Sequence, residues 1–242
     1  MYLKEIKRNW NAFGERDPLW AIRTNPDKKN GGWDEGEFFA SGEEDIASFL
    51  AQAAEKKLPA AFGTALDFGC GVGRLSLPLA DRFADVVGVD CAPSMIERAA
   101  AYNTRPEKVR YLLNDKEDLS LFPDDSFDFI ISLFVLQHMP KVLFTPYIGE
   151  FVRVLKPGGA LIFQLVGECL APDEEVRHSS RRWLASLLAR LRYAVRGPAM
   201  EMHGADPAEV KVLLSAAGGR VVDVAETRHA RIWMSYLYLV TK

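Results

Sequence analysis

The feature that most constrains the fold is a short apolar run that leads directly into three spaced glycines. The segment reads Ala65-Leu66-Asp67-Phe68-Gly69-Cys70-Gly71-Val72-Gly73-Arg74. Glycine allows a backbone to turn sharply and lets a ligand approach main-chain amides without meeting a side chain. The segment therefore predicts a buried strand, a tight turn and a helix. A nucleotide-containing ligand would suit the turn, although the same glycines also fit a tight strand-to-helix turn that binds nothing.

The glycine spacing and the acidic residue before it separate the ligands that such a turn could hold. The dinucleotide fingerprint G-x-G-x-x-G would need glycine at position 74, where the chain has Arg74, and glycine falls instead at Gly73. The carboxylate of Asp67 at the strand end would repel a pyrophosphate, but it suits a ligand that carries an ammonium group. Both details disfavour NAD and FAD, and with them an NAD-dependent oxidoreductase.

Short apolar runs alternate with helical stretches from residue 64 onward, a pattern typical of an α/β fold with a parallel sheet covered on both faces. The expected strands are Thr64–Asp67, Val86–Asp90, Val109–Leu113, Phe127–Leu133, Ala160–Val166, Arg220–Glu226 and Ile232–Val240. The expected helices are Val72–Phe83, Ser94–Tyr102, Leu143–Leu155, Ser179–Val195 and one from Asp206-Pro207 to Ala217. Pro78 predicts a kink or a late start in the first helix, because proline lacks an amide donor.

The rest of the chain is interpreted as a front segment and an insert of one domain of 242 residues. The front segment, residues 1–58, is aromatic-rich and irregular over its first 40 residues. Ser41 and Glu44 then match a capping box, which predicts that a helix starts there and ends near Lys57. Residues 59–167 and 206–242 form the core, and residues 168–205 form the insert between its two parts.

Two further acidic positions follow predicted strands. The carboxylate of Asp90 can accept hydrogen bonds from both hydroxyls of a ribose, a device that NAD enzymes share. After the third strand, the run Leu113-Asn114-Asp115-Lys116-Glu117-Asp118-Leu119 places acceptors where an adenine amino group could bind. For Glu117 and Asp118 the run also fits an acidic turn that is simply exposed to solvent. These positions support a nucleoside ligand without identifying it.

The ordered motifs together resemble those of class I S-adenosylmethionine-dependent methyltransferases of the small-molecule branch. They are Asp67-Phe68-Gly69-Cys70-Gly71-Val72-Gly73, Val89-Asp90, Asp115-Lys116-Glu117-Asp118-Leu119, Phe122-Pro123-Asp124-Asp125-Ser126-Phe127-Asp128 and Arg153-Val154-Leu155-Lys156-Pro157-Gly158-Gly159. The resemblance covers about residues 59–167 and implies a seven-stranded, mostly parallel sheet whose last strand is antiparallel. It also implies S-adenosylmethionine as the cofactor, with S-adenosylhomocysteine as its product.

The resemblance assigns the cofactor-binding residues. It places the glycine loop and Asp67 around the methionine part, Asp90 on the ribose, Asp115 near the adenine, and Cys91 and Met95 beside the nucleoside. The other expected cofactor-binding residues are Phe68, Gly69, Cys70, Gly71, Gly73, Arg74, Lys116, Glu117 and Leu133.

Methyl transfer requires chiefly that two reactants are aligned and water is excluded, and a hydroxyl acceptor also benefits from a general base. His138 follows the fourth strand at the edge where such sheets bind ligands, so it is the candidate catalytic residue. It could instead only line the pocket. His178 and His203 in the insert are alternative candidates, although each also fits a surface or packing residue. The expected acceptor-binding residues are Trp20, Trp33, Phe39, Gln137, Gln164 and His203, and the front segment and the insert are expected to form a lid.

Composition and charge narrow the acceptor. The formal net charge of −3 gives no global reason to bind a polyanion. The motifs of amino-methylating and base-carbon-methylating DNA enzymes are missing, so no nucleic-acid partner is expected. The insert carries Arg177, Arg181, Arg182, Arg190, Arg192 and Arg196, which could bind an anionic acceptor or form the solvated face of an amphipathic helix.

The three cysteines are far apart, which predicts neither a disulfide framework nor a zinc site, and no other metal is expected. The first residues lack the apolar stretch of a signal peptide, so a cytoplasmic monomer or homodimer without membrane contact is expected. The resulting prediction is a methyltransferase that acts on a small polar metabolite, at oxygen rather than nitrogen. The alternative is a non-catalytic cofactor-binding module or partner subunit of the same fold.

Overall fold

The computed structural model describes residues 2–169, 198–229 and 233–242. Its centre is a seven-stranded sheet in the order β3-β2-β1-β4-β5-β7-β6. Strands β1 to β5 run parallel in their pairings, and β7 is antiparallel to both of its neighbours. The bounds are β1 Thr64–Phe68, β2 Asp85–Asp90, β3 Val109–Leu113, β4 Phe127–Ser132, β5 Leu155–Cys169, β6 Arg220–His229 and β7 Trp233–Thr241.

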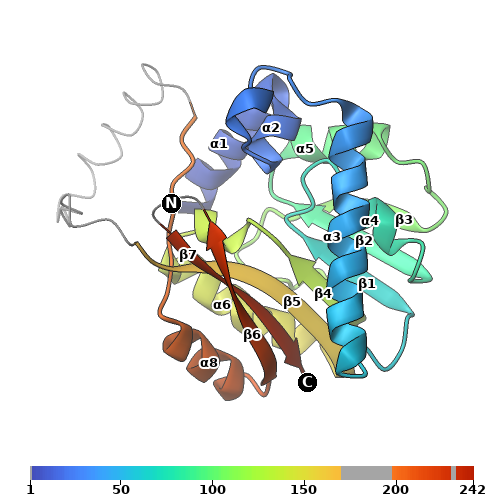
Figure 1. Ribbon diagram of the computed structural model, residues 1–242, viewed down its shortest axis with the longest axis vertical. Coiled ribbons are helices and arrows are strands. Elements are labelled where there is room, and N and C mark those ends of the chain that lie inside the picture. The colour runs from blue at the N-terminus through green and yellow to red at the C-terminus, as the bar shows by residue number, and fades with distance from the viewer. Residues whose placement is uncertain (1, 170–197, 230–232) are drawn as a thin grey trace.

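Helices cover both faces of the sheet (Figure 1). Apolar side chains of α3 (Glu35–Glu55) and of the short α4 (Ser76–Leu79) pack on one face, and those of α6 (Lys141–Val154) and α8 (Pro207–Ala216) pack on the other. Strand β1 serves both layers because successive side chains alternate between the faces. Ala65 packs in the apolar cluster beneath α3 and α4, and Leu66 and Phe68 pack in the cluster beneath α6 and α8. This double burial confirms the predicted α/β class and the mostly parallel sheet.

All seven predicted strands are present. Their ends differ from the predicted ends by at most three residues, except that β5 begins earlier than predicted. The helix expected over 72–83 is reduced to α4, so the late start predicted from Pro78 is confirmed. Asp206 caps α8 by accepting a hydrogen bond from the Ala208 amide. The expected helix Ser179–Val195, with most of the insert and its arginines, lies outside the described residues.

The predicted helix start at Ser41 is wrong. Helix α3 begins at Glu35, where Asp34 caps it by accepting a hydrogen bond from the Glu37 amide at 2.9 Å. Ser41 lies one and a half turns inside, and its hydroxyl donates to the Phe38 carbonyl. A Cβ atom on the adjacent Gly42 would lie 2.2 Å from the Arg74 carbonyl oxygen. Small residues at 41 and 42 therefore serve close packing of α3 against the glycine loop.

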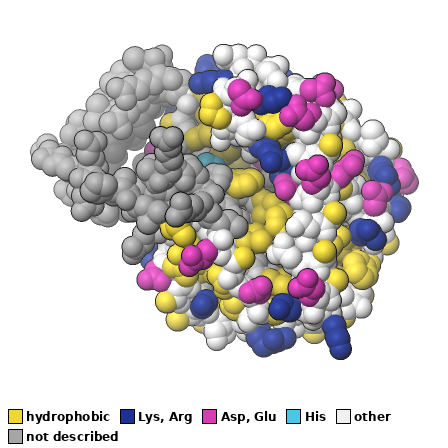
Figure 2. Space-filling model, viewed as in Figure 1, with side chains coloured by type: hydrophobic (Ala, Val, Ile, Leu, Met, Phe, Trp, Pro, Cys, Tyr) yellow, Lys and Arg dark blue, Asp and Glu magenta, His cyan; other side chains and the backbone are white. Residues whose placement is uncertain are grey.

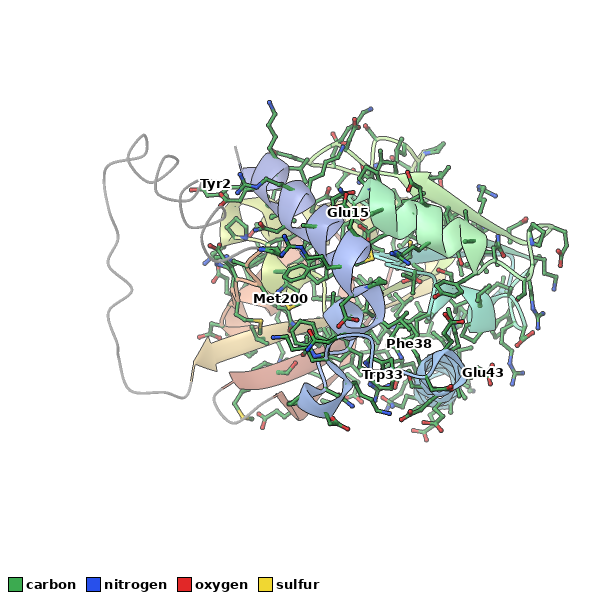
Figure 3. All side chains as sticks on the ribbon, turned by 90° about the horizontal axis from the view of Figure 1, so that it is seen from above. Tyr2, Glu15, Trp33, Phe38, Glu43 and Met200 are labelled. Atoms are coloured by element: carbon green, nitrogen blue, oxygen red, sulfur yellow. The ribbon has the colours of Figure 1, made fainter. Side chains whose placement is uncertain are left out.

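The front segment is helical rather than irregular. It forms α1 (Tyr2–Arg16), α2 (Pro18–Ile22) and the single turn η1 (Pro26–Lys28). Helix α1 packs on α5 (Pro93–Ala101): the Asn11 side chain accepts from the Ser94 amide, and Arg98 donates to the Gly14 carbonyl. Seen from above, α1 and α5 lie side by side across the sheet edge (Figure 3). The front segment thus covers the edge at which the parallel strands end.

A last element, the single turn η2 (Leu136–His138), follows β4. Among the described residues, no helix combines the length and the apolar character needed to cross a bilayer.

Candidate functional site

The main cavity lies at the carboxyl edge of the sheet, beneath α1. It contains about 710 Å³ of space not filled by atoms, its open mouth included. Its walls come from the ends of β1, β2, β3 and β4 and from α1, α2, α5 and α6. The lining residues are Leu3, Ile6, Trp10, Ile22, Phe68, Gly69, Gly71, Val89, Asp90, Cys91, Met95, Asn114, Leu133, Phe134, Val135, His138, Met139 and Tyr147. The space-filling view shows hydrophobic side chains gathered in the hollowed centre of one face (Figure 2).

The glycine loop forms one wall because it has no side chains at two of its turning points, Gly69 and Gly71. Gly69 and Gly71 have φ angles of 77° and 53°, a region that disfavours other residues. A Cβ at Gly69 would meet Val135 at 2.2 Å, and a Cβ at Gly71 would meet Ile22 at 2.5 Å. The loop therefore presents bare backbone to the cavity, and even one methyl group at either position would require neighbours to move.

Asp90, at the end of β2, holds this loop in place. Its carboxylate accepts hydrogen bonds from the amides of Gly71 at 3.0 Å and Ala92 at 2.9 Å. Burial raises the pKa of Asp90, and these two donors oppose that increase. The carboxylate lines the cavity while anchoring its wall, so its acceptor oxygens are fixed in direction before any ligand arrives.

Asp67 lies beneath the loop rather than on the cavity wall. Its side chain is 2% exposed and accepts a hydrogen bond from the Ser76 hydroxyl at 2.6 Å. Burial raises the pKa of Asp67 to about 6, although the Ser76 hydroxyl and the Arg74 charge oppose the change. With Asp90, it makes the floor of the cavity electronegative, which favours a cationic ligand.

Arg74 forms contacts within the protein core and does not reach the cavity. Its guanidinium is almost completely buried and lies 2.7 Å from the Asp45 carboxylate of α3, with the Ser41 hydroxyl at 3.3 Å. Burial lowers the pKa of Arg74, and the contact with Asp45 opposes that effect. Gly73, next to it, lies against the Tyr111 hydroxyl. Neither residue lines the cavity, so the structure gives Arg74 the task of joining the loop to α3.

The far end of the cavity matches part of the predicted nucleoside site. Cys91 and Met95 line it as expected, and burial raises the pKa of the Cys91 thiol. Asp115 is exposed and does not line the cavity, and the same holds for Lys116 and Glu117; the neighbouring Asn114 lines it instead. The Asn114 amide donates to the Asp118 carbonyl and to the Tyr147 hydroxyl.

His138 lies in the opposite wall, at the end of η2. Its Nδ1 lies 2.8 Å from the Glu201 carbonyl oxygen, and its Nε2 lies 3.2 Å from the side-chain nitrogen of Gln137. A carbonyl oxygen only accepts, so Nδ1 carries the proton and Nε2 of the neutral ring has the lone pair. The Trp10 ring packs edge-on against the imidazole, 5.1 Å between centroids.

A buried polar network holds η2 and therefore His138. Gln164 of β5 donates to the Gln137 side-chain oxygen at 3.0 Å and to the Ser235 hydroxyl, and it accepts from the Phe134 amide. Phe134 has a φ angle of 60°, an unusual conformation for a bulky residue. Gln164 thus fixes both a strained turn and the amide that contacts the imidazole, and it does not line the cavity.

The other expected acceptor-binding residues are not brought to this cavity. Trp20 donates to the Asn25 carbonyl, and Trp33 donates to the Arg23 carbonyl and packs on Phe38. Phe38 in the first turns of α3 and Trp33 just before this helix lie together, away from Tyr2 at the start of α1 (Figure 3). Phe39 packs on Phe38 and Tyr102. The predicted lid aromatics therefore join the front segment to the core.

Besides the Glu201 carbonyl that contacts His138, the insert places His203 near the site. The His203 amide donates to the Gln137 carbonyl at 2.7 Å, while its ring lies 3.4 Å from the Glu201 carboxylate. His178 lies outside the described residues.

Sequence reasoning missed the part of the wall that comes from α1. Leu3, Ile6 and Trp10 recur at spacings of three and four residues, which is a helical pattern and could have revealed an apolar helix face. Asn114 and Tyr147 were missed because their roles depend on how α6 packs. Among residues 2–169, 198–229 and 233–242, no group of three or more His, Cys, Asp or Glu side chains is placed to hold a metal ion.

The strand order, the single antiparallel strand β7, the glycine loop after β1 and the carboxylate after β2 together define the class I methyltransferase fold. Residues 66–163 match the family described as Methyltransferase domain.

Comparisons with curated proteins and solved structures agree with this class. The chain is 38% identical over 101 residues to 2-methyl-6-phytyl-1,4-hydroquinone methyltransferase of Synechocystis sp., covering 41% of this chain and 30% of that protein. It is 35% identical over 155 residues to a ubiquinone biosynthesis O-methyltransferase of Xanthomonas oryzae pv. oryzae, covering 64% and 54%. The chain thus spans about a third to a half of the length of these relatives.

Among solved structures, magnesium protoporphyrin IX methyltransferase of Synechocystis PCC 6803 with bound SAM superimposes with a TM-score of 0.64. The match has 20% sequence identity and covers 100% of this chain and 98% of that one. At this identity the likeness establishes the fold.

Proposed function

We propose that this protein transfers the methyl group of S-adenosylmethionine to an oxygen atom of a small aromatic acceptor. One observation carries the proposal: a single cavity joins the bare glycine loop, the Asp90 carboxylate and the Nε2 side of His138. The matching family and the fold support the same activity.

The residues present fit S-adenosylmethionine. Bare backbone at Gly69 and Gly71 accommodates the amino-acid part, and the fixed oxygens of Asp90 suit the two ribose hydroxyls. Met95 and Asn114 line the end where the adenine would lie. The cofactor carries a net positive charge, because its sulfonium and ammonium outweigh one carboxylate, and Asp67 and Asp90 supply the opposite charge. When bound, this cofactor supplies an electrophilic methyl group.

The protein's own part in the reaction is to position the acceptor, exclude water and move one proton. In the transfer, a bond forms between the acceptor oxygen and the methyl carbon, the carbon–sulfur bond breaks, and its electron pair stays on sulfur. The hydroxyl proton passes to Nε2 of His138. The imidazolium that forms is oriented by the Glu201 carbonyl, which continues to accept from Nδ1. The Gln137 contact to Nε2, at 3.2 Å, is longer than a typical N–H donor contact, so an acceptor hydroxyl can replace it.

The cavity wall favours an acceptor less polar than the sequence predicts. Beyond the cofactor region the wall consists of Leu3, Ile6, Trp10, Leu133, Phe134 and Met139. An apolar wall that includes the flat rings of Trp10 and Phe134 suits an aromatic ring that carries a hydroxyl group. The two curated relatives compared above, one named for a hydroquinone and one for ubiquinone biosynthesis, support an acceptor of this class.

Isothermal titration calorimetry with S-adenosylhomocysteine tests the cofactor assignment. Asp90→Ala should weaken binding about 100-fold or more, because the ribose would lose two charge-assisted hydrogen bonds to the carboxylate and the glycine loop would lose its anchor. Asp85→Ala is the matched control, because Asp85 is exposed at the opposite end of the same strand. Wild-type affinity in Asp90→Ala would refute the ribose assignment.

Transfer of a radiolabelled methyl group to a panel of phenols, catechols and hydroquinones tests the reaction. His138→Ala should lower kcat about 100-fold with little change in S-adenosylhomocysteine affinity, and added imidazole should restore part of the rate. Unchanged turnover in His138→Ala would remove its role as the base. A wild-type protein that binds S-adenosylhomocysteine tightly but methylates no acceptor would instead support the non-catalytic alternative.

A further inference from the structure

A second, outer cavity lies against the first one. It contains about 360 Å³, its mouth included, and lies between α1 and the segment that contains residues 199–201. Its lining residues are Tyr2, Glu5, Ile6, Asn9, Trp10, His138, Pro140, Ala199 and Glu201. Ile6, Trp10 and His138 line both cavities. The outer cavity is thus separated from the candidate reaction centre only by these side chains.

Asn9 is an unexpected residue in this wall. It lies in the middle of α1, where asparagine is a mediocre helix former, and it is only 8% exposed. Within the described part of the chain, its side-chain carboxamide makes no hydrogen bond, although it lines the outer cavity. The polar atoms of this largely buried group keep some exposure to the open cavity, so water or a ligand can form hydrogen bonds with them there.

Asn11 of the same helix shows the ordinary arrangement. Its carboxamide accepts from the Ser94 amide at 2.9 Å and donates to the Glu15 carboxylate at 2.8 Å. Asn11 therefore joins α1 to α5, whereas Asn9 has a donor and an acceptor directed at a cavity. The difference leaves the Asn9 carboxamide available to a ligand that enters the cavity.

The side chains between the two cavities differ in how firmly they are held. Both ring nitrogens of His138 have hydrogen-bond partners, which fix the imidazole. Trp10 makes only ring contacts, with Phe13 and with His138, and no hydrogen bond within the described residues. Rotation of the Trp10 side chain would therefore join the cavities without moving α1, and a molecule could then extend from His138 to Asn9.

The charges around the outer cavity limit what can bind there. Two carboxylates, Glu5 and Glu201, lie in its wall, and each has a cationic or ionisable neighbour, Arg8 at 3.7 Å and the His203 ring at 3.4 Å. No Lys or Arg side chain is among the described residues that line it. A carboxylate or phosphate on the ligand would be repelled, whereas a neutral hydroxyl or carbonyl can pair with the carboxamide.

We propose that the outer cavity is the acceptor's distal subsite and that Asn9 determines specificity by hydrogen bonding to a second, neutral oxygen on the acceptor ring. The proposal rests on the proposed methyltransferase function, because it places the first oxygen at His138. It commits the acceptor to a neutral dioxygenated ring such as a hydroquinone, rather than to the anionic acceptor that the arginine-rich insert suggested.

Isothermal titration calorimetry tests this assignment. Ring probes are titrated into the S-adenosylhomocysteine complex under anaerobic conditions, and no reaction occurs because this cofactor product has no methyl group to transfer. The probes are 2-methyl-1,4-hydroquinone, the two cresols that each lack one of its hydroxyls, and 2,5-dihydroxybenzoate, which has a carboxylate in place of the methyl group. The wild type should bind the hydroquinone about tenfold more tightly than either cresol, and 2,5-dihydroxybenzoate more weakly still. In Asn9→Leu, the preference for the hydroquinone over the cresol that lacks the hydroxyl group assigned to Asn9 should fall to about twofold or less.

The controls separate a ligand contact from a structural role. Asn9→Leu should unfold at the same or a higher urea concentration than the wild type, because it removes an unpaired buried carboxamide. Asn11→Leu should unfold at a lower concentration and keep the wild-type probe preference. An unchanged preference in Asn9→Leu, marked destabilisation of that variant, or failure of every probe to bind a wild type that binds S-adenosylhomocysteine normally would each overturn the proposal. Failure of S-adenosylhomocysteine itself to bind would instead overturn the proposed function.

Discussion

Asp67→Asn should make the ligand-free protein more stable while weakening its hold on a cationic cofactor. Asp67 is buried beneath the glycine loop, and burial raises the pKa of its carboxyl to about 6, from an ordinary value of 3.8. The folded protein therefore binds this proton more tightly than the unfolded chain does. The carboxyl costs no stability below about pH 4, lowers the free energy of unfolding progressively between about pH 4 and pH 6, and keeps that penalty at higher pH.

The size of the penalty follows from the same pKa difference. Each pKa unit corresponds to about 1.4 kcal/mol, so ionised Asp67 costs the fold about 3 kcal/mol at pH 7.5. Asparagine has nearly the same shape and retains an oxygen that can accept the hydrogen bond from the Ser76 hydroxyl. The variant should thus gain most of this amount at pH 7.5 and almost none near pH 4.

Urea unfolding of the ligand-free wild type and of Asp67→Asn, at half-unit steps from pH 4 to pH 8, measures this difference directly. The two free energies should be similar at pH 4, separate up to about pH 6 and then remain parallel. A constant difference over the whole range, or a less stable variant at pH 7.5, would refute the argument that burial of the ionised carboxyl dominates. The wild type alone is not informative, because its other carboxyls titrate over the same range.

The same variant also tests why the chain keeps a costly carboxylate. S-adenosylmethionine has one more positive charge than S-adenosylhomocysteine, and a negative charge in a low-dielectric floor attracts the former more strongly. Asp67→Asn should weaken S-adenosylmethionine binding by on the order of tenfold and S-adenosylhomocysteine binding clearly less. Equal weakening of both ligands would mean that Asp67 acts through the loop conformation rather than through its charge.

Three further variants probe the supports of the site. Arg74→Met should lower the free energy of unfolding by about 2 kcal/mol in urea, because it leaves Asp45 without its buried partner, and should leave S-adenosylhomocysteine affinity unchanged in calorimetry. Gly71→Ala should abolish S-adenosylhomocysteine affinity. Gly149→Ala, at a position in open space on α6, should instead raise the free energy of unfolding by about 1 kcal/mol. Gln164→Leu should lower kcat more than it changes KM and should alter the pH profile of turnover, because it releases the turn that holds the imidazole.

Strands β1, β2 and β4 were predictable because they are short and largely buried on both faces, so each appears as a separate apolar run. The glycine loop and Asp90 were predictable for a related reason, since residues directly after parallel strands meet at one edge. The start of α3 was predicted wrongly because Ser41 and Glu44 match a capping box although both lie inside a helix that Asp34 caps. Only contact with the loop shows that Ser41 is needed as a small buried residue and not as a cap.

The role of Arg74 shows a limit of a different kind. Its place in the glycine motif predicts a contact with the cofactor, yet its guanidinium turns toward Asp45 on α3, which precedes it by 29 positions in the chain. Position in a motif fixes where the backbone lies, but the direction of a long side chain depends on which distant helix offers a charge. No feature of residues 65–74 alone contains that information.

The two halves of the site therefore differ in how they are encoded. The cofactor half is built from strand ends, so local sequence determines it, and proteins with 20% identity can share the fold that forms it. The proposed acceptor half lies where α1 crosses the sheet edge, and the position of α1 depends on contacts such as Asn11 to Ser94 and Arg98 to Gly14. Changes on one face of α1, at Ile6, Asn9 or Trp10, would reshape the acceptor site without disturbing Asp90 or the glycine loop. Acceptor choice in this protein should accordingly respond to substitutions in the first turns of α1 that leave cofactor affinity unchanged.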